Sequence, residues 1–331
     1  MPSRRAILKK LDALEPGIAR AFREAVDSIR SKARLAELEA AIDAMDIERA
    51  TRAAGITPAA WSRLTEEIRL AYRESGDFAA SDAPARLGFQ FDMNNDRAAD
   101  WLLNHSSTMV TLIVNDQREA IRGALEAGLR RGANPRTTAL DIAGRLDRRT
   151  GRRAGGIIGL TAQQSRFVEN ARQQLSSGDP AQLRAYLGRE LRDRRFDSRV
   201  KAAIAAETPV KGIDQILARY SDRLLKHRGD TIARTESLAA LNEASDESLR
   251  QARDEGLVTD AARIWDATGD NRTRETHDAA EGQERGIDEP FSIGGTLMMH
   301  PGDPAGGAAN VINCRCVVRV EVDWVAQELA A

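Results

Sequence analysis

Apolar residues recur at helical spacing through most of the first 255 positions of the chain. Ile18, Phe22, Val26 and Ile29 stand four, four and three residues apart, which places their side chains on one face of an α-helix. Similar stripes contain Leu35, Leu38, Ile42 and Met45, and then Trp61, Leu64, Ile68 and Tyr72. The pattern predicts a mainly α-helical N-terminal region, an extended helical bundle.

Short polar signals predict where several helices begin. Asn134 and Asp179 each precede a proline, and Thr161 stands before an amphipathic stretch. Side chains of these types accept hydrogen bonds from the free N–H groups of a first helical turn, and proline fits the first helical position. The last helix is expected over about 213–255, and Gly229 is the point at which it could break.

The spacing of apolar residues changes after Gly256. Short apolar runs at 264–265, 291–293, 296–299 and 314–323 are separated by Gly, Asp and Pro, as expected of strands. The sequence therefore predicts four parts, with a small C-terminal α+β domain as the last. They are an N-terminal helical arm at 1–75, a linker at 76–95, a helical domain at 96–256 and the α+β domain at 257–331.

The composition predicts a protein without a membrane partner. No stretch approaches the roughly 18 uncharged apolar residues of a membrane span, and the first residues lack the apolar core of a secretory signal. Two cysteines in 331 residues do not make a disulfide framework and fit a reducing compartment. We therefore expect synthesis in the cytoplasm.

The formal net charge of −1 hides two oppositely charged regions. Residues 118–153 contain ten arginines and four acids, whereas residues 255–331 contain six arginines and fourteen acids. The first region is a candidate for binding double-stranded DNA or an acidic protein surface, and the second is expected to avoid DNA. The candidate binding residues are Arg130, Arg131, Arg145, Arg148, Arg149, Arg152 and Arg153.

Both cysteines stand in the segment VINCRC, ahead of a valine-rich run. On a strand, Cys314 and Cys316 would share one face and could begin a buried core, since free cysteine is among the most buried residue types. They could instead bind zinc with His277 and with His300 or Asp303, or serve in redox chemistry. A disulfide between them would close a very small, strained ring. We expect a core with both thiols near His277 and no cofactor, and structural zinc is the alternative.

A second cluster lies in the segment WDATGDNRTRETHDAAEGQ. A hydrolase would use His277 as a base or ligand and Asp270 to orient it or to bind a metal. A plain turn would instead bond its Asp and Asn side chains to its own backbone. We favour the turn, because no nucleophile or second clear ligand lies at a fixed spacing. The sequence also lacks the motifs GxxxxGK[ST], HExxH, GxSxG and GxGxxG.

Four segments in this order resemble the phage Mu F-like head morphogenesis proteins of tailed bacteriophages. They are IARTESLAALNEASDESLRQARDEG, WDATGDNRTRETHDAAEGQ, PFSIGGTLMMHPGDP and VINCRC, and the specific match covers about residues 230–323. FQFDMNNDRAADWLLNH and GLTAQQSRFVENARQQL also resemble the helical region before this domain in siphophage members. The residues that carry over by motif are Arg234, Thr235, Glu236, Trp265, Asp270, Arg272, Arg274, His277, Gly282, Pro301, Cys314, Arg315 and Cys316.

The resemblance implies a minor head protein that is made in the host cytoplasm and resides inside the phage head near the portal vertex. Its expected partners are the portal protein and the major capsid or scaffolding protein, in procapsid assembly, DNA packaging or genome ejection. We expect no enzymatic activity. The alternative is a metal-dependent nuclease or hydrolase, or a toxin-like domain, that uses His277, Asp270, Cys314 and Cys316. Against a toxin, the sequence ends soon after Trp324.

Overall fold

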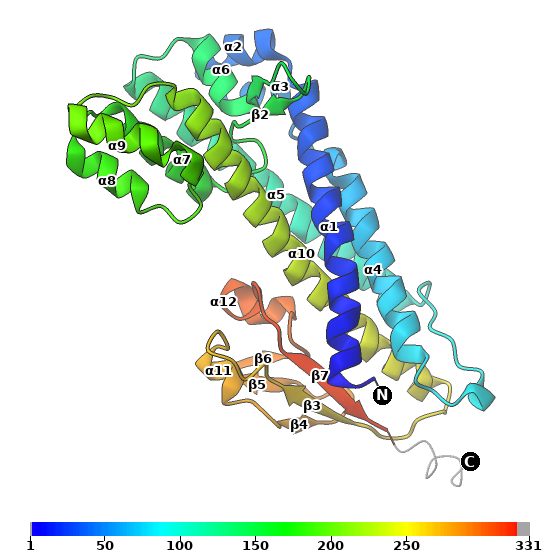
Figure 1. Ribbon diagram of the computed structural model, residues 1–331. Helices are drawn as coiled ribbons and strands as arrows, with labels where there is room; N and C mark the ends of the chain where they lie inside the picture. Colours follow the sequence, from blue (N-terminus) through cyan, green and yellow to red (C-terminus); the bar gives the residue numbers. More distant parts are fainter. Residues whose placement is uncertain (1, 323–331) are drawn as a thin grey trace. The chain divides into compact units, whose positions relative to one another are not determined.

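The computed structural model describes residues 2–322, and 64% of it is helical, with small antiparallel sheets near the C-terminus (Figure 1). The predicted fold class, mainly α followed by a small α+β region, is confirmed. The chain divides into two compact units, each assembled from distant segments. Unit 1 takes its described residues from Met1–Ala21, Leu64–Ser106 and Gly229–Ala331, and unit 2 comprises Phe22–Arg63 and Ser107–Arg228.

All residues of unit 2 are described, and they form helices and one short hairpin. The helices are the later part of α1 (Arg4–Lys32), α2 (Leu35–Asp43), α3 (Ile47–Ala53), the later part of α5 (Asp96–Arg130), α6 (Pro135–Ala143), α7 (Ala162–Ser176), α8 (Pro180–Leu187), α9 (Asp197–Ala206) and the first part of α10 (Ile213–Asp254). Strands β1 (Arg145–Leu146) and β2 (Arg153–Ala154) pair antiparallel. Helix α2 packs against α3 and α6, and α8 packs against α7 and α9.

Three helices of unit 2 begin where the sequence predicts. The Asn134 side chain accepts a hydrogen bond from the Thr137 N–H ahead of α6, and Asp179 does the same for Ala181 ahead of α8. Thr161 and Gln164 cap α7 reciprocally, each side chain bonding the backbone N–H of the other. These predictions are confirmed. A cap can be predicted from the sequence because it depends only on residues within one helical turn.

Unit 1 combines helices with the C-terminal strands. It contains the first part of α1, most of α4 (Ser62–Ala80), the first part of α5, the second part of α10, α11 (Glu275–Asp278) and α12 (Gly307–Val311). Its strands are β3 (Ala262–Asp266), β4 (Glu284–Arg285), β5 (Phe291–Ile293), β6 (Thr296–Met298) and β7 (Val317–Glu321). An antiparallel sheet has the order β4-β3-β7, and β5 pairs with β6 in a separate hairpin.

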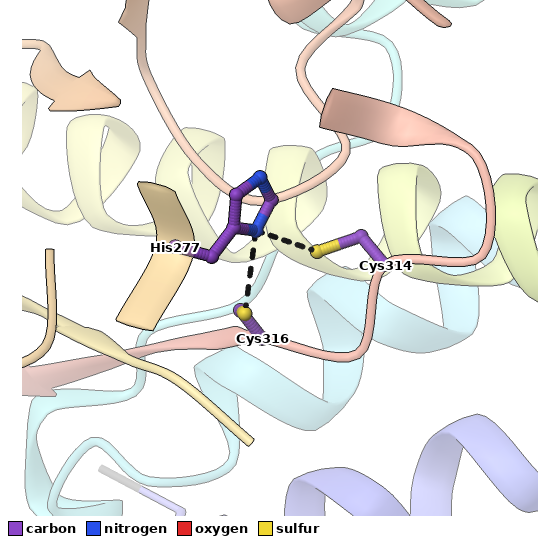
Figure 2. A group of neighbouring side chains, drawn as sticks. All are labelled: His277, Cys314 and Cys316. Atoms are coloured by element: carbon purple, nitrogen blue, oxygen red, sulfur yellow. Dashed lines mark hydrogen bonds between the residues drawn. The ribbon is translucent and has the colours of Figure 1, made fainter. Parts of the chain in front are cut away.

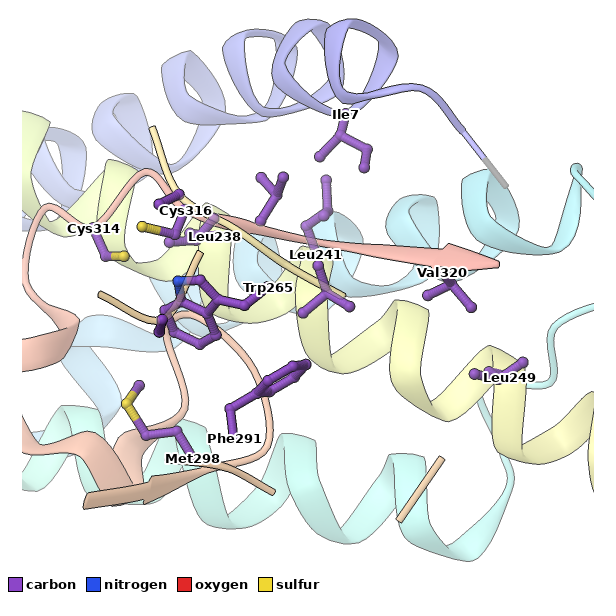
Figure 3. Close-up of a cluster of buried hydrophobic side chains, with 14 of the residues drawn as sticks. Ile7, Leu238, Leu241, Leu249, Trp265, Phe291, Met298, Cys314, Cys316 and Val320 are labelled. Atoms are coloured by element: carbon purple, nitrogen blue, oxygen red, sulfur yellow. The ribbon is translucent and has the colours of Figure 1, made fainter. Parts of the chain in front are cut away.

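The core of unit 1 crosses the predicted boundary at residue 257. Trp265 and Phe291 form an edge-to-face pair with ring centroids 5.4 Å apart, and they belong to the same buried cluster as Ile7 of α1 and Leu238 and Leu241 of α10 (Figure 3). Residue 257 therefore marks a change of secondary structure, whereas the C-terminal segment shares its core with two helices.

The predicted linker at 76–95 is too long at its beginning, because α4 continues to Ala80. Ser75 and Gly76 suggested a break, but both are buried within the helix. The Ser75 hydroxyl donates to the Ala71 carbonyl at 2.6 Å. A Cβ on Gly76 would lie 2.2 Å from the Phe91 ring, so glycine is required here by close packing and not by a turn.

Two further boundaries differ from the expectation. Helix α10 runs without a break through Gly229, because packing along a long helix outweighs the cost of about 1 kcal/mol for one glycine. Strand β7 begins at Val317, so Cys314 and Cys316 precede the strand in which they were predicted. The predicted end of that strand, Asp323, lies outside the described residues.

Within residues 2–322, no helix combines the length and the apolar character needed to cross a membrane.

We predict that Ile7→Ala destabilises the intact chain by about 2–4 kcal/mol, because it opens a cavity in the core that α1 shares with the C-terminal strands. Denaturant unfolding followed by tryptophan fluorescence measures the change. Lys9→Ala, on the exposed side of the same helix, should change stability by less than about 0.5 kcal/mol. Equal effects from the two substitutions would contradict the shared core.

Candidate functional site

The segment that contains both cysteines turns sharply at Asn313. Helix α12 ends at Val311, Asn313 has a φ of 56°, and the Cys314 N–H donates to the Val311 carbonyl at 3.1 Å. Asparagine adopts this left-handed conformation more readily than most residues. The turn directs the chain into β7 and presents the two cysteines just before the strand.

Three motif residues hold this turn from other elements. Thr235 of α10 accepts a hydrogen bond from the Asn313 N–H on its hydroxyl at 3.2 Å, and Arg234 donates to the Asn313 side chain at 3.4 Å. Arg274, next to α11, donates to the Ile312 carbonyl at 2.6 Å. The motifs around residues 234 and 274 therefore share one structural task, although they are forty residues apart.

His277, Cys314 and Cys316 come together at the end of the turn (Figure 2). The Nδ1 atom of His277 lies 3.5 Å from each sulfur, and the three donor atoms all lie within 4.8 Å of one another. The side chains are 1–2% exposed. The other ring nitrogen, Nε2, is buried without a hydrogen-bond partner among the described residues.

The two thiols have pKa values shifted in opposite directions. The pKa of the Cys314 thiol is lowered to about 7, first by the hydrogen bond with the Cys316 thiol and then, against its burial, by the backbone N–H groups of Cys316 and Arg315. The pKa of Cys316 is raised, first by its bond to Cys314 and then by burial. Cys314 is therefore the thiol that loses its proton first.

Asp270 lies at the edge of this site, bonded to arginine. Its two carboxylate oxygens accept hydrogen bonds from Arg315 Nη2 at 2.9 and 2.8 Å, and one accepts the Arg272 N–H at 2.9 Å. The bond from Arg315 is the main reason why the pKa of Asp270 falls to about 2. The backbone contact is the turn expected from the sequence, and the carboxylate forms no bond with His277.

The remaining motif residues position the elements around the cluster. Trp265 meets the His277 ring edge-on at 5.4 Å, and its carbonyl accepts the N–H of Gly282, whose φ is 72°. The carbonyl of Pro301 accepts a hydrogen bond from Asn242 at 2.7 Å. Glu236 bonds His105 of α5 at 2.5 Å.

His300 and Asp303, considered as further metal ligands, bind elsewhere. His300 Nε2 lies 2.9 Å from the Glu243 carboxylate. Asp303 accepts hydrogen bonds from the backbone N–H groups of Met299 and Ala305 at 2.6 and 2.8 Å. Neither joins the three donors that converge in the described part of the chain. His300 and Asp303, which the zinc alternative would need as a fourth ligand, are therefore bonded to other groups.

A cavity of about 230 Å³ borders the site. Its lining includes Cys314 and Arg315 together with Arg234 and residues of α1, among them Leu11 and Glu15. Cys314 thus lines a cavity, although its side chain is almost completely buried.

The sequence missed two contributors to this site. One is Asn313, whose only signal in the sequence is that asparagine tolerates the left-handed conformation better than most residues. The backbone N–H of Thr268 bonds the Cys316 sulfur, and backbone donors leave no signal in a sequence.

Comparison with known proteins identifies the region that carries this site. Residues 194–319 match the family model described as "Phage Mu protein F like protein". This segment belongs to that family. The resemblance noted for its motifs is thereby confirmed, and the Mu F-like segment (residues 194–319) points to a phage head-related protein.

One curated relative shares part of the chain. It is the "NAD(+)--arginine ADP-ribosyltransferase EFV" of Enterococcus faecalis, 34% identical over 98 residues, which are 30% of this chain and 20% of that protein. The chain thus spans about a fifth of the length of the curated relative it matches. No solved structure matches the chain.

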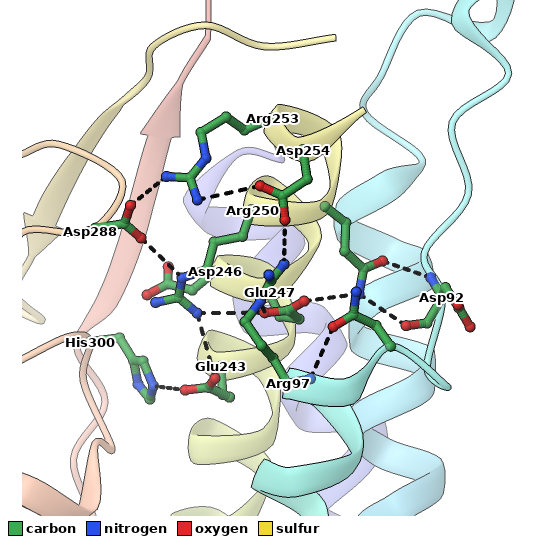
Figure 4. Close-up of polar contacts among 12 residues, drawn as sticks. Asp92, Arg97, Glu243, Asp246, Glu247, Arg250, Arg253, Asp254, Asp288 and His300 are labelled. Atoms are coloured by element: carbon green, nitrogen blue, oxygen red, sulfur yellow. Dashed lines mark hydrogen bonds and ion pairs between the residues drawn. The ribbon is translucent and has the colours of Figure 1, made fainter. Parts of the chain in front are cut away.

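The second part of α10 carries a network of charged side chains, several of them buried (Figure 4). Arg263 of β3, fully buried, donates to Asp246 at 2.6 Å. Arg97 of α5 donates to Glu247 at 2.9 Å. A buried ion that loses its partner destabilises a protein by about 3–5 kcal/mol, so these pairs fix which elements lie against α10 in unit 1.

The basic segment of unit 2 is largely neutralised internally. Seven of the ten arginines form ion pairs, namely Arg118, Arg122, Arg130, Arg131, Arg136, Arg145 and Arg152. Arg153 donates to the Gly144 carbonyl at 2.9 Å. Arg148 and Arg149 are exposed in the turn between β1 and β2.

The His300–Glu243 pair makes stability depend on pH. Burial alone would lower the pKa of His300, but the hydrogen bond and charge of Glu243, with Asp246 and Asp303, outweigh it and raise the pKa to about 9. The pKa of His300 in the folded protein exceeds the ordinary 6.5. The stability that the pair contributes is therefore complete below about pH 6.5 and is lost as the pH rises through 9.

We therefore predict that the melting temperature falls between pH 6.5 and pH 9, and that His300→Gln flattens this fall. Thermal unfolding at a series of pH values measures it. His227→Gln, at an exposed position of α10, is the matched control and should keep the slope of the parent chain. An unchanged slope in His300→Gln would show that other groups cause the pH dependence.

Proposed function

We propose that the chain is a minor head protein of a tailed bacteriophage that binds the portal protein and acts in procapsid assembly, DNA packaging or genome ejection. The observation that carries this proposal is the match of residues 194–319 to the Phage Mu protein F like family. Its place would be the interior of the head near the portal vertex, with the capsid or scaffolding protein as a further neighbour.

The candidate site supports a structural role over catalysis. A general base needs an orienting partner and access to the proton that it takes. His277 is 1% exposed and its Nδ1 faces two sulfurs, while Asp270 is bonded to Arg315. The residues that a hydrolase would use are thus occupied with one another or with arginine.

The similarity to the ADP-ribosyltransferase of Enterococcus faecalis is a weaker argument, and it would favour an enzyme. Its similarity covers only 20% of that protein, so most of its length has no counterpart in this chain. An accessory module can occur in proteins that are otherwise different, and a short shared segment is the similarity expected from it. We therefore do not extend the activity in its name to this chain.

We propose that the helical part of the chain, before residue 257, contacts the portal. The part of helix α5 in unit 2 carries two leucines, Leu112 and Leu129, which are 64% and 68% exposed. Aliphatic side chains gain free energy when a partner removes them from water. The C-terminal segment offers Leu297 at 60% exposure as a comparable apolar residue for a control.

We predict that the double variant Leu112→Asp and Leu129→Asp weakens portal binding at least tenfold, because the loss of two apolar contacts exceeds about 1.4 kcal/mol. The test is co-expression of the full chain with the portal protein of the same phage, followed by size-exclusion chromatography and titration. Leu297→Asp should bind like the parent chain.

Two results would count against this proposal. Loss of binding by Leu297→Asp alone would move the contact to the C-terminal segment. No complex with the portal, together with transfer of ADP-ribose from NAD to arginine by the purified chain, would replace the head role with an enzymatic one.

We propose that any contact with DNA is confined to the turn between β1 and β2. Arg148 and Arg149 are exposed there, and Arg152 is 78% exposed with a long 3.7 Å ion pair. Arginines already paired with acids must break those pairs before they can bind phosphate, which reduces the gain.

The prediction is a weak salt dependence. Binding through about three phosphates gives a slope of log K against log salt of about −3, whereas ten arginines would give about −9. Fluorescence anisotropy with a double-stranded oligonucleotide over a range of salt measures the slope. Arg148→Glu with Arg149→Glu should abolish binding, and Lys201→Glu on α9, also exposed, should preserve it. A slope near −9 would contradict the internal pairing.

A further inference from the structure

The contacts of His277 are difficult to satisfy without a positive ion. Its Nδ1 lies 3.5 Å from both Cys314 Sγ and Cys316 Sγ. A neutral ring nitrogen has one lone pair or one proton, so it can form a good hydrogen bond with only one of the two sulfurs. The other sulfur lies equally close to the same nitrogen without a hydrogen bond to it, although all three side chains are buried.

Backbone groups prepare the two sulfurs for negative charge. The N–H groups of Arg315 and Cys316 donate to the Cys314 sulfur, and the N–H of Thr268 donates to the Cys316 sulfur. Donors aimed at sulfur favour the thiolate over the thiol, and the thiolate is the form that binds metal. An apolar core with two neutral thiols gains little from such donors.

We propose that His277 Nδ1, Cys314 Sγ and Cys316 Sγ bind a zinc ion in the folded protein. Two thiolates and one imidazole are a donor set that suits zinc, and the ion replaces the unsatisfied contact with three favourable ones. Bond lengths of about 2.3 Å to sulfur and 2.0–2.1 Å to nitrogen in a tetrahedron separate sulfur from nitrogen by about 3.6 Å. The two observed separations of 3.5 Å agree with that geometry.

The fourth position of the tetrahedron belongs to a water molecule. Among residues 2–322, only these three His, Cys, Asp or Glu donors converge, and the cavity bordered by Cys314 provides room beside them. Asp270 does not fill the position, because Arg315 holds its carboxylate. The site therefore has three protein ligands and one exchangeable ligand.

The ion would act as a cross-link within unit 1. It joins α11, a helix of four residues, to the segment that precedes β7. Neither element is long enough to hold its place by its own backbone hydrogen bonds. Zinc binding adds directly to the free energy of folding where the ligands assemble only in the folded state, so removal of the ion should loosen this region.

The first test is metal analysis of the full-length chain, purified without a metal-affinity step or chelator. We expect about one zinc ion per chain. After exchange, Co²⁺ is the probe, and it should give a thiolate-to-cobalt charge-transfer band in the ultraviolet and intense tetrahedral bands in the visible. Metal-free protein that gives neither band with Co²⁺ would overturn the proposal.

Three variants remove a proposed ligand, namely Cys314→Ser, Cys316→Ser and His277→Gln. Two control variants, His227→Gln and His300→Gln, change a histidine outside the site. The first three should lose the charge-transfer band or reduce it by about half for a single cysteine, since each thiolate contributes separately. The other two should retain the band, because their rings lie outside the site. Full retention of the band in a variant without both cysteines would place the metal elsewhere and reject the assignment.

A second measurement does not require variants to fold. A mercurial reagent added to the native parent chain should release zinc in step with the titration of two thiols, and a chelator should lower the melting temperature of unit 1. Zinc that stays bound after both thiols have reacted, or a melting temperature that is indifferent to the chelator, would contradict the cross-link.

Discussion

The burial of the second half of α10 governs the construction of unit 1. Asp246 and Glu247 are only 2% and 1% exposed, and a buried carboxylate without a partner costs several kcal/mol. The elements packed against the helix therefore have to supply the opposite charge, and Arg263, Arg97 and His300 do so at 2.6, 2.9 and 2.9 Å from α10 carboxylates. Apolar contacts are compatible with many arrangements of the elements packed against α10, whereas these charge pairs are compatible with few. Losing one member of such a pair would leave a buried charge unpaired, and the apolar side chains give the core most of its stability.

Four motif residues of the Mu F-like segment, Arg234, Thr235, Arg274 and Arg315, hold one turn in place. Arg234 and Thr235 contact Asn313, and Arg274 contacts the residue before it. Arg315 anchors the other end of the turn through Asp270. A left-handed residue costs free energy unless its surroundings fix it, and these contacts fix it from three elements. The spacing of Cys314 and Cys316 relative to His277 is therefore a property of the whole arrangement, not of the short sequence that contains them.

Local signals predicted much of the fold, and long-range contacts account for the errors. Helix caps such as Thr161 depend on neighbours within one turn and could be read directly. Gly76 looked like part of a linker because its reason for being glycine, the Phe91 ring, lies fifteen positions away. Val317 is completely buried because it belongs to the cluster that includes Ile7 and Leu11, which stand about three hundred positions earlier in the sequence. The sequence grouped His277 with both cysteines through their motifs, but the Asn313 contacts and the Asp246–Arg263 pair required the three-dimensional arrangement.

The participation of α1 in the core has a consequence for the Mu F-like segment. Ile7 and Leu11 lie outside residues 194–319, the part that matches the family, yet they are 5% and 8% exposed in the cluster formed by that part. The segment alone would present the apolar surface that these two side chains cover, and exposed apolar surface of this kind promotes association. In this chain the surface is covered by α1, whose residues stand outside the matched range. The surface beneath α1 is therefore the part of the Mu F-like segment that depends on sequence from elsewhere in the chain.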